Sequence, residues 1–288
     1  MVNEIYSIFK ENLPDIVRSE EVVKRILSDK NNYIISYRDG GKLIGVSVIN
    51  ENTIYLICID KSFQNRGIGT KLLNQSEKYI ASKGFNRIIV GVGKDYIMPG
   101  IPMNNGAHIF FKKHKYVHSW GDCGCFDMSQ QLEDFVYAEH SIGDTINEIT
   151  YRWAAIDDLE NIVKCVSDAE ESFVQYYNNK SLYEKGTNTS VLIAEKDNEI
   201  FGTLMVSIET EGKDMGSVGC TTTVRKYRNK GIATNLVTLG TKYLKDIGLS
   251  KAVLGFTYTH ILNMYGRAGY KVSMEYYMGE KVVENTQE

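Results

Sequence analysis

Gln64-Asn65-Arg66-Gly67-Ile68-Gly69-Thr70 is the stretch of this 288-residue chain that decides its fold. It lies between an apolar run at residues 54–59 and an amphipathic run at residues 68–80, which indicates a strand, a tight loop and a helix start. Two glycines at alternate positions let the backbone approach a ligand closely, and the first-turn N–H groups of a helix have no partner inside it. We therefore predict that the loop binds a phosphate group.

The same pattern occurs a second time, as Arg228-Asn229-Lys230-Gly231-Ile232-Ala233-Thr234. The spacing between the copies also relates Leu72 to Leu236 and Gly84 to Gly248, well beyond the loop. One such loop would be weak evidence, but two in register with their flanking segments make a chance match improbable. The chain is therefore interpreted as a tandem repeat of one fold.

Hydrophobic periodicity predicts similar elements in both halves. In the first half we expect helices over residues 4–10, 19–27, 68–82 and 105–114, and strands over 33–37, 43–49, 53–59, 87–92 and within 116–128. In the second half we expect strands over residues 148–153, 190–195, 200–208, 217–223, 252–257 and 272–278, and helices over 156–169, 231–247 and 261–267. The opening strand of the second half has no counterpart in the first, so the first sheet is either one strand short or borrows one. Polar residues 131–147 predict a linker between domains 1–130 and 148–288.

The composition excludes several classes of protein. With 43% hydrophobic and 24% charged residues, the chain is ordinary globular material for two domains. A net charge of -3 argues against nucleic acid as a partner, because a phosphate-backbone binder needs a basic face. Neither a membrane span nor a signal peptide is expected, since no apolar run approaches ~18 residues. Five cysteines with a single C-x-C pair predict no metal site and free thiols in a reducing cytoplasm.

A strand, then Q/R-x-x-G-x-G/A, then an amphipathic helix, a strand and a short helix resembles the GNAT superfamily of acyl-CoA-dependent N-acyltransferases. The resemblance covers nearly the whole chain, twice. It implies an α/β fold of two tandem domains, each with a mixed, mostly antiparallel central sheet flanked by helices. It also implies an acetyl-CoA-dependent N-acetyltransferase, in which a small-molecule or peptide amine attacks the thioester directly.

The resemblance also implies the cofactor-binding residues. In that family the loop amides hold the coenzyme A pyrophosphate, and the preceding strand bonds the pantetheine arm through its backbone. The matching positions in the first domain are Ile57, Ile59, Gln64, Arg66, Gly67, Ile68, Gly69 and Thr70. Those in the second domain are Thr221, Thr223, Arg228, Gly231, Ile232, Ala233 and Thr234. Neither loop has the Gly-Lys-Ser/Thr ending of a nucleotide triphosphatase, which removes nucleotide hydrolysis as an alternative.

The family carries a tyrosine, four residues before a Gly-aromatic pair, that protonates the departing thiolate. Tyr265, followed by Gly269 and Tyr270, matches this pattern and is the predicted catalytic residue. In the first domain Phe111 stands at the acid position and Lys115 at the glycine position. A general acid contributes ~10²–10⁴ in rate, and phenylalanine has no proton to give. The second domain thus has the better acid, and the first the better-formed loop.

The general base is left open. Neither strand before a loop contains the glutamate that many family members use there, and the candidates are Glu275 and the acidic, aromatic residues 168–177. We interpret His108, His114 and His118 as packing or solvent-facing side chains, because none has an obvious carboxylate partner. Three alternatives remain: a non-catalytic coenzyme A-binding module, one degenerate domain that serves as a scaffold for the other, and an active site in the first domain with another proton donor. The oligomeric state is also left open.

Overall fold

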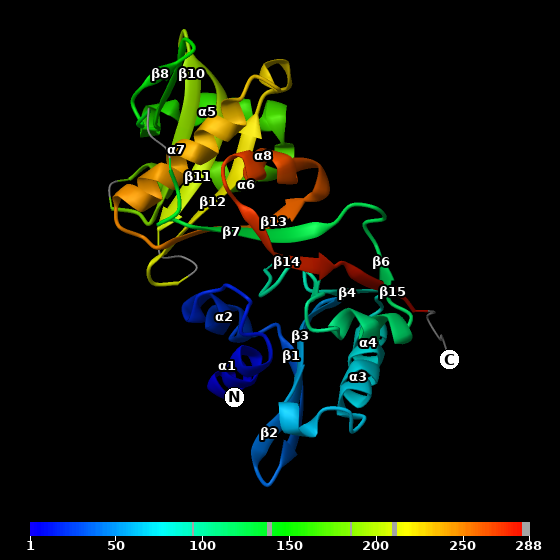
Figure 1. Ribbon diagram of the computed structural model, residues 1–288. Helices are drawn as coiled ribbons and strands as arrows, with labels where there is room; N and C mark the ends of the chain where they lie inside the picture. The colour runs from blue at the N-terminus through cyan, green and yellow to red at the C-terminus, as the bar shows by residue number, and fades with distance from the viewer. Residues whose placement is uncertain (94, 137–139, 185, 209–211, 284–288) are drawn as a thin grey trace. The chain divides into compact units, whose positions relative to one another are not determined.

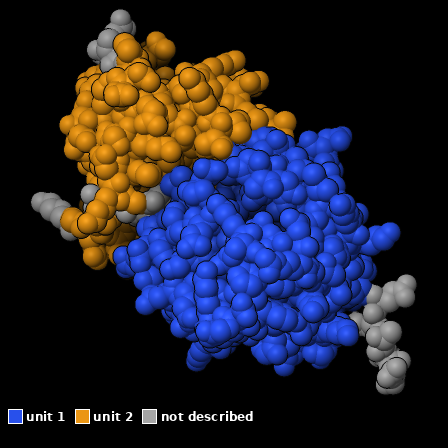
Figure 2. All heavy atoms as spheres, turned by 60° about the horizontal axis from the view of Figure 1, so that its bottom comes forward, with its two compact units in different colours: residues 1–126, 274–288 blue, residues 127–273 orange. Residues whose placement is uncertain are grey.

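The computed structural model describes residues 1–93, 95–136, 140–184, 186–208 and 212–283 (Figure 1). The chain divides into two compact units, coloured separately in Figure 2. Unit 1 comprises Met1–Phe126 and Met274–Glu288, and unit 2 comprises Asp127–Ser273. Unit 1 is therefore built from both ends of the chain, whereas the sequence interpretation placed residues 274–288 in the second domain.

Unit 1 contains a mixed sheet with the strand order β1-β2-β3-β4-β15-β6. Its helices are α1 (Val2–Asn12), α2 (Glu20–Leu27), α3 (Ile68–Ser82) and α4 (Ala107–Lys113), with the 3-10 turn η1 (Lys61–Phe63). Its strands are β1 (Tyr33–Asp39), β2 (Lys42–Asn50), β3 (Thr53–Ile59), β4 (Arg87–Val90), β5 (Ile101–Pro102), β6 (Val117–His118) and β15 (Gly279–Val282). Strands β1, β2 and β3 are antiparallel, as the sequence predicts, and β4 lies parallel to β3.

Unit 2 repeats this plan in a sheet of order β5-β14-β7-β13-β12-β11-β10-β9-β8, in which the short strand β5 pairs with the end of β14. Its helices are α5 (Leu159–Ala169), α6 (Val174–Tyr177), α7 (Ile232–Asp246) and α8 (Leu262–Arg267), with 3-10 turns η2 (Ile156–Asp158), η3 (Glu171–Phe173), η4 (Lys180–Tyr183), η5 (Arg225–Tyr227) and η6 (Thr259–Ile261). Its strands are β8 (Thr145–Ile146), β9 (Ile149–Trp153), β10 (Thr189–Lys196), β11 (Glu199–Ile208), β12 (Met215–Thr223) and β13 (Lys251–Tyr258). Strands β7 (Cys125–Gln131) and β14 (Lys271–Tyr277) cross the boundaries between the units along the chain.

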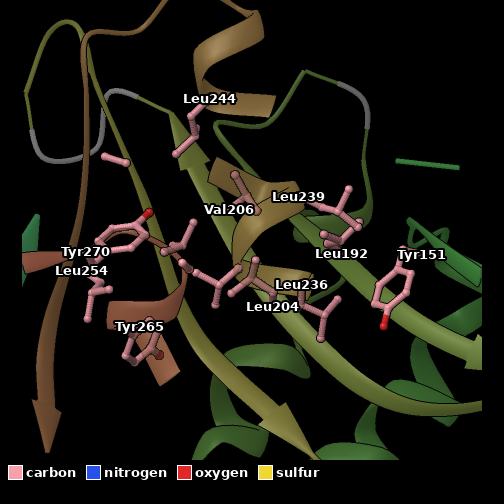
Figure 3. Close-up of a cluster of buried hydrophobic side chains, with 14 of the residues drawn as sticks. Tyr151, Leu192, Leu204, Val206, Leu236, Leu239, Leu244, Leu254, Tyr265 and Tyr270 are labelled. Atoms are coloured by element: carbon pink, nitrogen blue, oxygen red, sulfur yellow. The ribbon is translucent and has the colours of Figure 1, made fainter. Parts of the chain in front are cut away.

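The core of unit 2 forms where α7 packs on the sheet (Figure 3). Leu236 and Leu239 of α7 lie in one buried cluster with Leu192 and Leu204 of strands β10 and β11. Gly240 of α7 allows this close approach, because an added Cβ would lie 2.7 Å from Leu204 Cδ2. Burial of such side chains supplies most of the stability of a fold, at roughly 25 cal/mol per Å² of apolar surface.

The two units exchange their closing strands. Strand β15, at the end of the chain, lies between β4 and β6 in unit 1, with Glu280 opposite both Ile89 and Val117. Strand β7, which follows β6 in the sequence, lies instead between β14 and β13 in the sheet of unit 2. The first sheet thus borrows a strand, as the sequence analysis considered, but at its closing position. Among the described residues, this sheet has no counterpart of β9, the strand that opens unit 2.

Part of the expected linker at residues 131–147 belongs to the folded core. Leu132 and Phe135 are buried in the main cluster of unit 2, and Thr145–Ile146 form β8 against β9. Residues 137–139 of the same stretch lie outside the described residues. The polar composition of the stretch concealed Leu132 and Phe135, which the fold buries, whereas Val136 of the same stretch is exposed.

Candidate functional site

Strands β3 and β4 separate in unit 1 and leave one side of β3 without a strand partner. They pair only at Thr53 with Ile89 and at Ile54 with Val90, where β4 ends. The Gly91 N–H closes this short ladder with a hydrogen bond to the Ile54 carbonyl at 3.0 Å. Strand β3 continues to Ile59, so its second half presents backbone groups to the space between the strands.

The loop after β3 has the same backbone geometry as its repeat in unit 2. Gly67 precedes α3 with φ 79° and ψ -2°, and Gly231 precedes α7 with the same two angles. Asn65 and Asn229 are also alike, with φ values of 59° and 63°. A left-handed φ favours glycine, because a Cβ would crowd the following carbonyl. Both loops therefore direct unpaired first-turn amides outward in a shape that suits an anion.

The first side chain of each loop holds the loop in place. Gln64 Nε2 donates hydrogen bonds to the Ile59 carbonyl at 3.2 Å and to Asn12 Oδ1 at 2.9 Å. Arg228 acts in the same way in unit 2, since its Nε donates to the Thr223 carbonyl at 3.0 Å and its Nη2 to a carbonyl at the end of α5 at 3.1 Å. These two predicted cofactor residues thus join the loop to the preceding strand and to a neighbouring helix.

A cleft of about 920 Å³ opens in unit 1 between the separated strands, the loop and α4. Six of the predicted cofactor residues line it, namely Ile57, Ile59, Gln64, Gly67, Gly69 and Thr70. The other two are not among the lining residues: Arg66 stacks its guanidinium on the Phe63 ring at 5.0 Å, and Ile68 faces Gly45 on β2. The fold thus brings a phosphate-binding loop and an unpaired strand edge into one cavity.

Phe111 of α4 occupies the acid position of unit 1. It is buried, lines the cleft and packs edge-on against Tyr116, with 5.3 Å between ring centroids. Nearby, His114 accepts a hydrogen bond from the Thr70 hydroxyl at 3.3 Å through Nε2, because its Nδ1–H donates to the Phe110 carbonyl at 2.9 Å. His114 therefore connects α4 to the first turn of α3, and so has a structural role.

In unit 2 the predicted acid, Tyr265, lies beside the point where strands β12 and β13 separate. Strands β12 and β13 pair only from Met215 to Ser217, and the Tyr265 hydroxyl lies 3.1 Å from Thr221 Oγ1 on the unpaired part of β12. Tyr265 is buried, and burial raises its pKa because the phenolate would lose its hydration. Tyr177 donates its hydroxyl to the Cys220 carbonyl on the same strand at 2.6 Å. The Cys220 carbonyl and the Thr221 hydroxyl, which could meet a cofactor here, are thus engaged with side chains of the protein itself.

The remaining predicted site residues of unit 2 have structural surroundings. Ile232 is part of the buried core, and Thr223 donates its hydroxyl to the neighbouring Thr222 carbonyl at 2.8 Å. Ala233 and Thr234 lie in the first turn of α7, where Thr234 accepts a hydrogen bond from Thr238 through its carbonyl. The fold therefore gives unit 2 the shape of the loop, with the Thr223 hydroxyl beside it hydrogen-bonded within the strand.

Two other polar candidates, Glu275 and His118, have backbone hydrogen bonds that join segments of unit 1. Glu275 is exposed, and its carbonyl accepts a hydrogen bond from the Met103 N–H at 3.0 Å. His118 Nδ1 accepts the Met278 N–H at 2.9 Å, which anchors the start of β15. Within the described ranges no group of three histidine, cysteine or acidic side chains could hold a metal ion. No helix in the same ranges is long and apolar enough to cross a membrane.

Comparison with protein families adds independent evidence. An acetyltransferase (GNAT) domain model matches residues 4–94, and an acetyltransferase (GNAT) family model matches residues 153–270. The chain belongs to the GNAT family. One match in each half confirms the tandem two-domain arrangement and the mixed α/β fold that the sequence predicts. A search of curated proteins found no match.

Solved structures of other GNAT proteins share the fold over nearly the whole chain. A GCN5-related N-acetyltransferase from Sphaerobacter thermophilus has a TM-score of 0.70 at 16% identity, with 97% of this chain and 91% of that chain covered. A tandem GNAT protein from the clavulanic acid biosynthesis pathway has a TM-score of 0.68 at 11% identity, covering 98% and 94%. A glucosamine N-acetyltransferase region of a fungal multi-domain beta-N-acetylglucosaminidase has a TM-score of 0.76 at 17% identity, covering 97% of this chain but 37% of that protein. At these identities the likeness shows the fold.

Several residues that line the cleft were not predicted from the sequence, and Asn12, Asp15 and Lys61 are the polar ones that matter most for its chemistry. No motif marks them, because they lie at the end of α1, in the connection to α2 and in η1. The only available signal was Pro14, which indicated a break between the first two helices.

Proposed function

We propose that the protein is an acetyl-CoA-dependent N-acetyltransferase in which unit 1 binds the cosubstrate. The cleft of about 920 Å³ carries this proposal, because the phosphate-binding loop and the unpaired edge of β3 share it. Lys61 lies at the loop end of the same cleft and adds a positive charge for a phosphate. A cytoplasmic location and an amine acceptor remain predictions from the sequence.

Acetyl-CoA would supply the reactive thioester. The loop and the N-terminus of α3 would hold its pyrophosphate, since their amides and helix dipole favour negative charge. On the edge of β3 that faces β4, backbone N–H groups beyond Ile54 have no β4 partner, and they would stabilise the oxyanion that forms when the amine attacks. A thiol has a reference pKa of about 8.5, so the thiolate can leave without a protein acid, although more slowly.

The test changes one residue in the loop of unit 1 and, as the control, the equivalent residue in the loop of unit 2. Gly69→Asp places a carboxylate where the pyrophosphate would bind, and an acid in a first helical turn is compatible with folding. The new Cβ would lie 3.3 Å from Ile59 Cδ1, which is the movable end of a side chain. Ala233→Asp makes the same change at the equivalent position of unit 2.

We expect isothermal titration calorimetry with acetyl-CoA to show a loss of affinity of tenfold or more for Gly69→Asp and none for Ala233→Asp. The reverse pattern would place the cosubstrate in unit 2. Absence of binding to the wild type would refute the proposed function altogether.

One observation favours a second function. Because Phe111 replaces the acid, unit 1 could bind coenzyme A without fast turnover and serve as a binding module. Saturable binding of acetyl-CoA in unit 1, combined with no release of thiol in the presence of any tested amine, would favour this second function over the transferase.

A further inference from the structure

The connection between α1 and α2 forms part of the cleft wall. Residues 12–15, which we call the α1–α2 connection, all line the cleft. Asn12 is joined to the phosphate-binding loop through Gln64, as described above. At the other end, Asn104 Nδ2 donates a hydrogen bond to Asp15 Oδ2 at 3.0 Å. The connection is therefore tied both to the loop and to the segment that precedes α4.

The cleft has one charge of each sign. Among the described residues that line it, Lys61 is the only basic side chain and Asp15 the only acidic one. Lys61 lies in η1 beside the phosphate-binding loop, so its charge suits the anionic end of the cosubstrate. Asp15 accepts its hydrogen bond from Asn104, in the segment that precedes α4, and not from a residue of the loop. The negative charge of Asp15 therefore needs a partner other than the anionic end of the cosubstrate.

Two hydrogen-bond acceptors at Asp15 and Asn104 have no donor among the described residues. A side pocket of about 30 Å³, lined by Asp15, Asn104 and Asn105, adjoins the cleft and shares these residues with it. Asn104 uses its amide NH₂ on Asp15, and Asn105 Oδ1 accepts the Ala107 N–H at 2.9 Å. No described residue donates a hydrogen bond to Asp15 Oδ1 or Asn104 Oδ1. Two acceptors, one of them charged, match a ligand that is a cation and a hydrogen-bond donor.

We propose that Asp15 binds the ammonium group of the acceptor, with Asn104 orienting the carboxylate. The acceptor class is a small primary amine without a carboxylate next to its amino group, such as an amino sugar or a diamine. An α-amino acid would bring its own carboxylate towards Asp15, and like charges at short distance repel. This inference rests on the proposed function and assigns the acceptor side of the same cleft.

Bonds and protons balance in the group-transfer step without a base from the protein. The bound ammonium releases one proton to solvent, and the neutral nitrogen forms the new N–C bond as the C–S bond breaks. The second proton leaves the nitrogen and ends on the coenzyme A thiolate. Asp15 thus concentrates and orients the acceptor, and it is expected to affect KM more than kcat.

The experiment measures thiol release from saturating acetyl-CoA with glucosamine, 1,4-diaminobutane or glycine as the acceptor. Asp15→Asn keeps the size of the side chain and removes its charge, and Asp15→Glu keeps the charge. Asp39→Asn removes an equally exposed charge outside the cleft and serves as the control. We expect Asp15→Asn to raise KM for glucosamine or the diamine about tenfold with kcat within about threefold. Asp15→Glu should recover part of the loss, and Asp39→Asn should behave as wild type.

Calorimetry with acetyl-CoA on the same variants separates the two proposals. Unchanged cosubstrate affinity in Asp15→Asn is expected, because Asp15 is hydrogen-bonded to Asn104 and not to the loop. The inference is overturned by an unchanged KM in Asp15→Asn, by glycine as the preferred acceptor, or by acetyl-CoA binding without transfer to any of the three amines. A wild type that does not bind acetyl-CoA would refute the proposed function instead.

Discussion

Strand β15 completes the sheet of unit 1 although it lies at the end of the chain. Truncating the chain after Met278 removes this strand from between β4 and β6. We expect unit 1 to lose its fold, and with it the binding of acetyl-CoA, while unit 2 keeps β14, β7 and the rest of its sheet. The cleft would thus be lost through a deletion far from its own residues in the sequence.

The size of the effect follows from the register. β15 makes three register pairs with β4 and two with β6, and the Val283 N–H donates to the Asn86 carbonyl at 2.8 Å. Antiparallel strands average one hydrogen bond for each register pair, so the five pairs and the Val283 bond contribute roughly 6 kcal/mol at about 1 kcal/mol net for each bond. The free energy of unfolding of a domain is typically only about 5–15 kcal/mol, so this loss would remove much of the stability of unit 1. The ion pair between Lys281 and Glu77 is lost as well.

Hydrogen exchange and acetyl-CoA titration together provide the assay. Amides of β3 and α3 should lose protection in the truncated chain, whereas amides of β10 and β11 should keep it. Ser129→Pro provides the reciprocal control, because it interrupts β7 inside the sheet of unit 2. It should weaken protection in unit 2 and spare acetyl-CoA binding. Wild-type affinity in the truncated chain would refute the strand exchange.

Three further predictions concern single side chains. Phe111→Tyr should raise kcat about tenfold or more, because it supplies a general acid in unit 1. Tyr265→Phe should leave kcat within about twofold of wild type. The opposite pattern in the rates of thiol release would move the reaction to unit 2. Lys115 has φ 72°, so Lys115→Gly should stabilise unit 1 by about 0.5–1 kcal/mol in urea unfolding, and no gain would contradict the strain. The hydrogen bond from Lys42 lowers the pKa of Asp60 to about 2, so this carboxylate contributes stability above pH ~4 that is lost as the pH falls through 2. Thermal unfolding should show Asp60→Asn below wild type at pH 7 and equal to it near pH 2, and equality at pH 7 would contradict this role.

Local signals in the sequence predicted the repeated parts of this protein well. Helix α3 begins at Ile68 and ends at Ser82, as expected, because the glycine loop and the apolar periodicity act within a few residues. The hairpin of β1 and β2 turns at Gly40 and Gly41, both with positive φ, as their sequence predicts. The family resemblance also placed six residues that the fold does bring to the cleft of unit 1.

The sequence by itself therefore determined the fold class, the two loops and their strand-loop-helix surroundings, since these depend on neighbouring residues. Only the tertiary structure decided which closing strand joins which sheet. Backbone hydrogen bonds can form between any two strands, so they do not specify which strand is the partner. It also decided that Gln64 holds the loop in place and that Asp15 meets Asn104, 89 residues away. Contacts between distant segments depend on how packed elements place them, and no spacing along the chain encodes that placement.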